Sequence, residues 1–216
     1  MPNPFLHLAV AQEVAAGTIT DLPPFYLGSI APDAIHAFAN APRPRKVASH
    51  LLHRDEQMHE SDNVKNREKT LAFLAEHRDF PNRAFYLGYC VHILTDHQWA
   101  MTVYRDFLDA YTRAKAPPNA SDEAFYQDVD GLSAMLCQQC PWIKEVARLL
   151  ARAGGMDVLG LVVADEVDAW RRQTLKWLDA ADKRVDYTPS YMALAGLQRF
   201  VFEAGRVVSA AVKDYL

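Results

Sequence analysis

The sequence predicts an all-α protein with a single domain spanning residues 1–216. Along most of the chain apolar residues recur at spacings of three and four, which is the repeat of an amphipathic helix. No alternating apolar and polar run is long enough to predict a strand, and 50% of the residues are hydrophobic. One segment, residues 84–99, is apolar nearly all round, which is typical of a helix buried inside a bundle.

The first helix is expected over residues 5–16, because Gly17 stands just past its last apolar residue. The stretch from Asp21 to Lys46 holds five prolines, so we expect a long loop with short turns there. Further helices are expected over residues 48–59, 65–78, 82–114 and 157–179, with others opening at Ser121, Pro141 and Thr188.

Composition excludes several classes of protein. The formal charge of −4 and the pI of about 6.0 provide no basic field, which argues against a nucleic-acid partner. The chain has no apolar run of roughly 20 residues, so we expect no transmembrane segment. No basic start of a signal peptide precedes the first apolar run, and three cysteines suit a reducing compartment. We therefore expect a cytoplasmic protein, and interpret Cys137 and Cys140 as a coincidental pair at a helix–helix junction.

All eight histidines fall within the first 97 residues. The buried helix contains His92 and Asp96, which are four apart and share a face. Burying an unpaired carboxylate costs several kcal/mol, so Asp96 needs a partner. An ion pair with His92 would satisfy it, and so would a metal ion that takes imidazole and carboxylate ligands. The spacing alone leaves both interpretations open.

Other candidate ligands stand on neighbouring segments. His50 and His53 are three apart on the helix expected over 48–59, and His7 lies on the first helix. Metal sites in helical bundles recruit ligands from several helices that face inward. The remaining candidates are Asp33 and His36, which flank the loop after Pro32, and His97.

Some residues near these candidates have a simpler interpretation. His97 points about 100° round the helix from Asp96, so we expect it to support the ligands or face solvent. His59 and His77 are expected at the surface. We also expect solvent-facing positions for the segment 43–46 and for Asp165, Glu166 and Asp168, and a core or cleft-lining position for Trp99 and Tyr104.

Four pieces of the sequence resemble the zinc-dependent phospholipase C superfamily, which also holds the S1/P1-type nucleases. They span roughly residues 5–100, and their order and character carry the resemblance. The most specific piece is an aromatic-Leu-Gly sequence followed by His-x3-Asp in a buried helix. The four pieces are His7, Phe25-Tyr26-Leu27-Gly28-Ser29-Ile30-Ala31-Pro32-Asp33, Ala48-Ser49-His50, and the segment from Ala84-Phe85-Tyr86-Leu87-Gly88-Tyr89 to His92 and Asp96.

The resemblance implies an all-α fold with a metal cluster at the base of a cleft and hydrolysis of phosphodiesters. It implies that His50, His92 and Asp96 are ligands of one Zn²⁺, with Asp33 completing that site or acting as general base. His7 would help to hold a second Zn²⁺, with Asp96 bridging. Asp33 and Asp96 are then the catalytic candidates, and the substrate is a small-molecule or lipid phosphoester.

The chain departs from the family pattern in two places. The family's third zinc site needs a His shortly after the helix Asp, but residues 100–102 are Ala-Met-Thr and no His follows His97. Secreted members use a processed N-terminal Trp as a ligand, whereas this chain begins Met1-Pro2. We therefore expect one or two metal ions rather than three. The alternatives are a non-catalytic metal-binding descendant of the family and an HD-type phosphohydrolase. The HD-type motif is an adjacent His-Asp pair, and here the order is reversed in Asp96-His97, which counts against it.

Overall fold

The computed structural model describes residues 1–216 with two exceptions. Residues 39–40, 53–59, 118–119, 159, 182 and 184–186 are not described, and neither are the side chains of residues 60–63. The described part is all-helical and forms one domain, as predicted, and its only β-type pairing is an isolated bridge between Val158 and Val162. Its α-helices are α1 Pro4–Ala15, α2 Leu22–Gly28, α3 Arg43–Ser49, α4 Glu60–His77, α5 Arg83–Met101, α6 Val103–Arg113, α7 Ser121–Gln138, α8 Ile143–Arg152, α9 Ala164–Ala181 and α10 Leu194–Val212, with 3-10 helices η1 Ala31–His36 and η3 Lys213–Tyr215.

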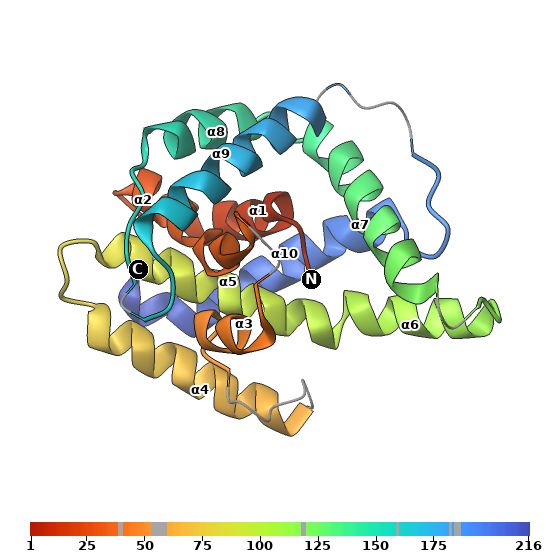
Figure 1. Cartoon of the computed structure of the whole chain (residues 1–216), viewed down its shortest axis with the longest axis horizontal. Coiled ribbons are helices and arrows are strands. Elements are labelled where there is room, and N and C mark those ends of the chain that lie inside the picture. The colour runs from red at the N-terminus through yellow and green to blue at the C-terminus, as the bar shows by residue number, and fades with distance from the viewer. Residues whose placement is uncertain (39–40, 53–59, 118–119, 159, 182, 184–186) are drawn as a thin grey trace.

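Helix α5 lies at the centre of the molecule, between α4 on one side and α1 and α2 on the other (Figure 1). Its residues 84–97 and 99 are all buried, which explains why this segment lacks a polar face. α5 contacts α1, α2, α4, α6, α10 and η1, so side chains that leave it in different directions reach most of the N-terminal half of the chain.

The prediction of a long loop from Asp21 to Lys46 is wrong. Helices α2, η1 and α3 all lie in this stretch, and each has a proline at its first or second position. Proline is tolerated there because the N–H that it lacks has no intrahelical partner in the first turn. The prolines therefore mark where these helices begin.

Other helix boundaries also differ from the predictions. No helix continues from Ala48 through residue 52, because α3 ends at Ser49 and Leu51 takes a φ of 56°. The long helix expected over 82–114 is broken at Thr102, whose φ and ψ are −123° and −87°. The last two helices begin later than expected, at Ala164 and Leu194.

The start of α10 is delayed because a buried carboxylate binds the preceding backbone. Asp128 of α7 is fully buried, and its two oxygens accept hydrogen bonds from the amides of residues 190, 191 and 192 and from the hydroxyl of Tyr187. Backbone N–H groups committed to a side chain cannot be arranged as a helix, so this segment is an anchored loop.

Helices α2 and α5 approach each other closely through two glycines. A Cβ added to Gly28 would lie 2.1 Å from the carbonyl oxygen of Phe85, and one added to Gly88 would lie 2.0 Å from that of Phe25. Both glycines end the same tetrapeptide, Phe-Tyr-Leu-Gly, at residues 25–28 and 85–88. The contact is therefore reciprocal, and it holds the backbone after α2 against the face of α5 that carries His92.

Candidate metal centre

Five of the predicted ligands meet in one buried cluster. None has more than 6% of its surface exposed. They come from four elements of the first half of the chain: His7 from α1, Asp33 from η1, His50 from the residue that ends α3, and His92 and Asp96 from α5. The structure thus brings together residues that the sequence separates by up to 89 positions (96 − 7).

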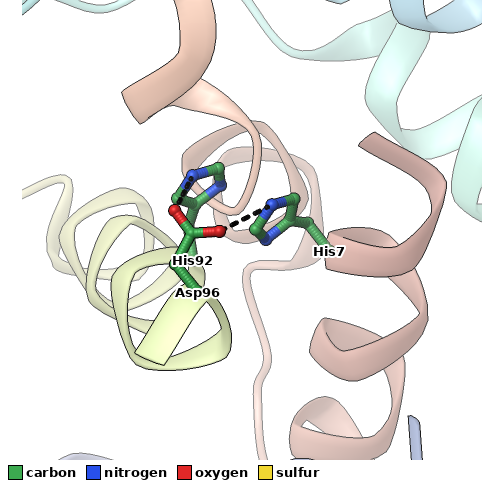
Figure 2. A group of neighbouring side chains, drawn as sticks. All are labelled: His7, His92 and Asp96. Carbon is green, nitrogen blue, oxygen red and sulfur yellow. Dashed lines mark ion pairs between the residues drawn. The ribbon is translucent and has the colours of Figure 1, made fainter. Parts of the chain in front are cut away.

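Asp96 occupies the middle of the cluster. Its Oδ2 lies 3.3 Å from Nε2 of His50 and 3.6 Å from Nε2 of His92, and its Oδ1 lies 3.7 Å from Nε2 of His7. Figure 2 shows the carboxylate between His7 and His92, with one oxygen directed to each ring. One carboxylate therefore reaches imidazoles from three elements.

Asp33 of η1 lies close to two of the same histidines. Its Oδ1 lies 3.4 Å from Nε2 of His50 and its Oδ2 lies 4.0 Å from Nε2 of His92. The rings of His7 and His92 stack, with centroids 3.7 Å apart and planes 10° from parallel. Two groups have ligand atoms close enough to share a metal ion, within 4.8 Å of one another: His7, His92 and Asp96, and Asp33, His50 and His92.

Backbone carbonyls orient two of the imidazoles. Nδ1 of His92 lies 2.9 Å from the carbonyl oxygen of Ser29, and Nδ1 of His50 lies 3.1 Å from that of Lys46. A carbonyl only accepts, so each Nδ1 carries the proton when this bond forms, and Nε2 presents its lone pair to the cluster. This arrangement is how proteins fix histidine ligands of metals.

Polar atoms at the centre are buried without hydrogen bonds. Within the described part of the chain, the Nε2 atoms of His7, His50 and His92 and the Oδ1 atoms of Asp33 and Asp96 have no hydrogen-bond partner. Their mutual contacts are ion-pair distances of 3.3–4.0 Å without hydrogen-bond geometry. Buried polar atoms normally have a hydrogen-bond or metal partner. We therefore infer that these converging atoms bind a further group.

Burial and neighbouring charge set the protonation of the cluster. Burial, reinforced by the nearby imidazole of His92, lowers the pKa of His7 to about 3, and burial also lowers the pKa of His92. Burial opposes the protonated form of His50 too, but contacts with both carboxylates outweigh it and raise the pKa of His50 to about 9. His7 and His92 are thus neutral at pH 7, whereas His50 holds a proton when no metal is bound.

Both carboxylates are ionised. Burial would raise the pKa of Asp33 and of Asp96, but the adjacent histidines, His50 first, more than offset this and hold both pKa values below the usual range. Among the five candidate ligands, one imidazolium against two carboxylates leaves a net negative charge. The amino group of Met1 also interacts with Asp96 and Asp33, but burial lowers its pKa and so disfavours its charged form. A divalent cation in place of the His50 proton would neutralise the net charge of the ligands, so the donor set fits such an ion in charge as well as in ligand type.

The remaining histidine predictions have mixed outcomes. His36 ends η1 and is half-buried, and His97 is buried beside the cluster, but neither belongs to the two ligand groups. His53 and His59 lie outside the described residues. His77 is half-buried rather than fully exposed: its ring packs among Phe73, Phe80 and Tyr86, and its Nδ1 lies 2.7 Å from the carbonyl oxygen of Phe73.

A cavity of about 280 Å³ opens beside the cluster, and His50 and Asp96 form part of its wall. Trp99 and Tyr104 also line it: Trp99 is buried in the core, whereas Tyr104 is exposed. Lys46 of α3 contributes a cationic side chain. Apart from the candidate ligands, the segment 43–46 and the two aromatic residues, no sequence signal marks this wall, because its other members come from distant segments. They are Met1, Leu52, Ile93, His97, Ala100, Asp122, Phe125 and Tyr126.

Residues 43–44 and Asp165 are exposed as expected, and residues 45–46 and Asp168 are partly exposed. Glu166, in contrast, is mostly buried in an ion pair, and the segment 43–46 is not a loop. The segment belongs to α3, and the guanidinium of Arg45 binds the Glu166 carboxylate of α9 through two hydrogen bonds of 2.6 and 2.8 Å. This fork-to-fork pair is the favoured geometry of arginine with a carboxylate. It joins the helix that ends at His50 to the C-terminal half of the chain.

Cys137 and Cys140 lie at the junction of α7 and α8 and are not joined to each other by a disulfide. Across the described residues, every helix is too short or too polar to cross a membrane. No family model, curated protein or solved structure matches the chain significantly.

Proposed function

We propose that this protein is a metal-dependent hydrolase of phosphoesters. The observation that carries the proposal is the convergence of three imidazole Nε2 atoms and two ionised carboxylates at one buried point, without hydrogen-bond partners among the described residues. An ion-pair cluster alone would leave a net negative charge buried, which is costly. The resemblance to the zinc-dependent phospholipase C superfamily suggests the reaction class.

Zn²⁺ is the favoured ion, because mixed imidazole and carboxylate ligands suit it. Asp33, His50, His92 and Asp96 would hold one ion, and His7 with Asp96 would take part in a second. Such an ion lowers the pKa of a bound water and offsets charge on a phosphoryl oxygen. The two ligand groups share His92, so one or two ions are expected.

The protein's own groups would then position the substrate and move a proton. Asp33 is ionised and lies 3.4 Å from Nε2 of His50, so it would either complete the ligand set of the first ion or, if it does not bind the metal, accept a proton from the attacking water. Lys46 lines the cavity next to His50, where its ammonium can bind a phosphate oxygen. Small-molecule and lipid phosphoesters are both candidate substrates, and the net charge of −4 argues against nucleic acid.

A non-catalytic metal-binding role is the second candidate. Among the described residues, the ligand groups are confined to this one cluster, so the third zinc of the resembled family has no counterpart there. An HD-type site is less favoured, because Asp96 precedes His97 and His97 belongs to neither ligand group.

Metal analysis of the purified protein tests the proposal, together with hydrolysis of bis-p-nitrophenyl phosphate. We expect one or two equivalents of zinc and measurable hydrolysis, with both lost in His50→Ala, His92→Ala and Asp96→Asn. His77→Gln is the matched control, since it changes a half-buried histidine outside the cluster. A protein that takes up no zinc would refute the metal site, and a zinc-loaded but inert protein would favour the non-catalytic role.

A further inference from the structure

The cavity beside the cluster has an aromatic wall built around Phe125. The Phe125 ring lies 6.1 Å from Trp99, 5.1 Å from Tyr104 and 5.3 Å from Tyr126, measured between centroids and with tilted or edge-on planes. All four residues line the cavity. Trp99 and Phe125 are 2% exposed, whereas Tyr104 and Tyr126 are 37% and 56% exposed. The first two residues therefore form the buried part of the wall, and the two tyrosines form the part that faces solvent.

One polar atom of this wall lacks a partner. The indole Nε1 of Trp99 is buried and has no hydrogen bond within the described part of the chain. A buried indole N–H usually finds an acceptor. Trp99 lines the cavity with only 2% of its surface exposed, so an occupant that carries an oxygen acceptor would form this bond once the indole moves to admit it.

The volume limits what can enter. Small-molecule pockets commonly measure about 300–1,000 Å³, so a cavity of about 280 Å³ is at the small end. A cavity of about 150 Å³ can hold a benzene ring, which leaves room here for one ring and a small substituent. Lys46 favours an anionic group beside His50 and Asp96, whereas the exposed carboxylate of Asp122 disfavours one in its own neighbourhood.

We infer that this cavity is a subsite for a single uncharged ring, and that the substrates are phosphoesters of small ring-bearing alcohols with one oxygen acceptor. The phosphate lies toward Lys46, His50 and Asp96, and the ring lies against Trp99 and Phe125. The phosphate half of this assignment rests on the proposed function. The ring half rests on the aromatic wall and requires no metal.

The ring subsite is tested first on chelator-treated protein with acetophenone, which has one ring and one carbonyl acceptor. The indole N–H resonance of Trp99 is identified by its absence in Trp99→Phe. We expect this resonance to shift on titration and to saturate in the millimolar range. Ala100→Phe, which places a ring in the cavity, should weaken binding at least tenfold. Ala210→Phe, an exposed position on α10, should leave it within twofold. An unmoved Trp99 resonance, or unchanged binding by a folded Ala100→Phe, overturns the subsite.

The second measurement compares phenylphosphonate with methylphosphonate on the zinc-loaded wild-type protein by calorimetry. The phenyl compound should bind at least tenfold more tightly, and this ratio needs no variant that might fail to fold. Lys46→Met should weaken the binding of both phosphonates and leave the ratio of their affinities unchanged. Equal affinities would refute the ring subsite and leave the metal site standing. Acetophenone binding by a protein that takes up no zinc would refute the proposed hydrolase instead.

Discussion

Replacing Gly88 by alanine tests how the fold positions His92. In an exposed helix this change stabilises by about 1 kcal/mol, because alanine is the better helix former. In α5 the new methyl would lie 2.0 Å from the carbonyl oxygen of Phe25 and 2.9 Å from the amide nitrogen of Ser29. Both are backbone atoms, so the clash cannot be relieved by rotating a side chain. We therefore expect Gly88→Ala to lower the free energy of unfolding rather than raise it.

The magnitude follows from the distance. Close carbon–oxygen contacts between backbones lie near 3.3 Å, so α2 and α5 must separate by about 1.3 Å to accept the methyl. Overpacking a core costs about 1–3 kcal/mol, and a backbone clash belongs at the upper end. We therefore expect a net loss of at least about 2 kcal/mol, or roughly 4–8 °C in Tm for a chain of this length.

The separation should also weaken metal binding. The same contact places the carbonyl oxygen of Ser29 2.9 Å from Nδ1 of His92, and a movement of this size breaks that bond. Loss of such a supporting contact typically lowers metal affinity about 10–100-fold. Zinc affinity measured by competition with a chromogenic chelator would show this, even for a variant that is fully folded.

Urea denaturation followed by circular dichroism gives the free energy of unfolding. Gly196→Ala is the matched control, since it is also helical but has no atom within 4 Å of the added methyl, and it should lose no stability. Gly28→Ala should behave like Gly88→Ala. The double variant should lose less stability than the sum of the losses in the two single variants, because one separation of the helices relieves both clashes. A Gly88→Ala protein as stable as Gly196→Ala, or fully additive losses, would refute the reciprocal contact.

Three further predictions concern other parts of the molecule. Chelation should lower Tm, and zinc at 100 times its Kd should stabilise by about 2.7 kcal/mol, measured by calorimetry; an unchanged Tm would contradict binding to the folded state. Asp128→Ala should cost about 3–5 kcal/mol in urea denaturation, because four donors lose a buried acceptor. A double-mutant cycle of Arg45→Ala and Glu166→Gln should give a coupling of about 1 kcal/mol or less, since the arginine is 42% exposed; a coupling near zero would mean that the pair does not stabilise the protein.

The chain's periodicity predicts most of its helices, and helical geometry predicts that His92 and Asp96 share a face. The errors concern helix ends and the stretch from residue 21 to 46, where whole helices were not predicted. Five prolines between residues 21 and 46 indicated a loop, because proline interrupts a helix interior. The rule holds for interiors only, and here the prolines stand in first turns. Leu51 has a left-handed φ just after α3 ends, and leucine is not a residue type that predicts such a conformation. The end of this helix could therefore not be read from the sequence.

The convergence of ligands could be predicted only in part. Spacing relates His92 to Asp96, but nothing local relates them to His7, Asp33 or His50, which arrive from other elements. The repeated Phe-Tyr-Leu-Gly was the available signal for the contact of α2 with α5, since a glycine in a buried helix often marks a close approach of backbones. The carbonyl acceptors for His50 and His92 were invisible, because a backbone carbonyl is the same at every residue.

The half of the chain without histidine nevertheless shapes the cluster. Asp33 and His50 sit on η1 and at the end of α3, short elements that could not hold a fixed position alone. Helix α9 fixes both: Glu166 binds Arg45 within α3, and the amide of Gln173 donates to the carbonyl oxygen of Ala37, directly after η1, at 2.7 Å. The ligands thus come from residues 7–96, whereas the distances among them depend on a helix some 70 residues further along. For this reason the motif-bearing first half could suggest the ligands but not their geometry.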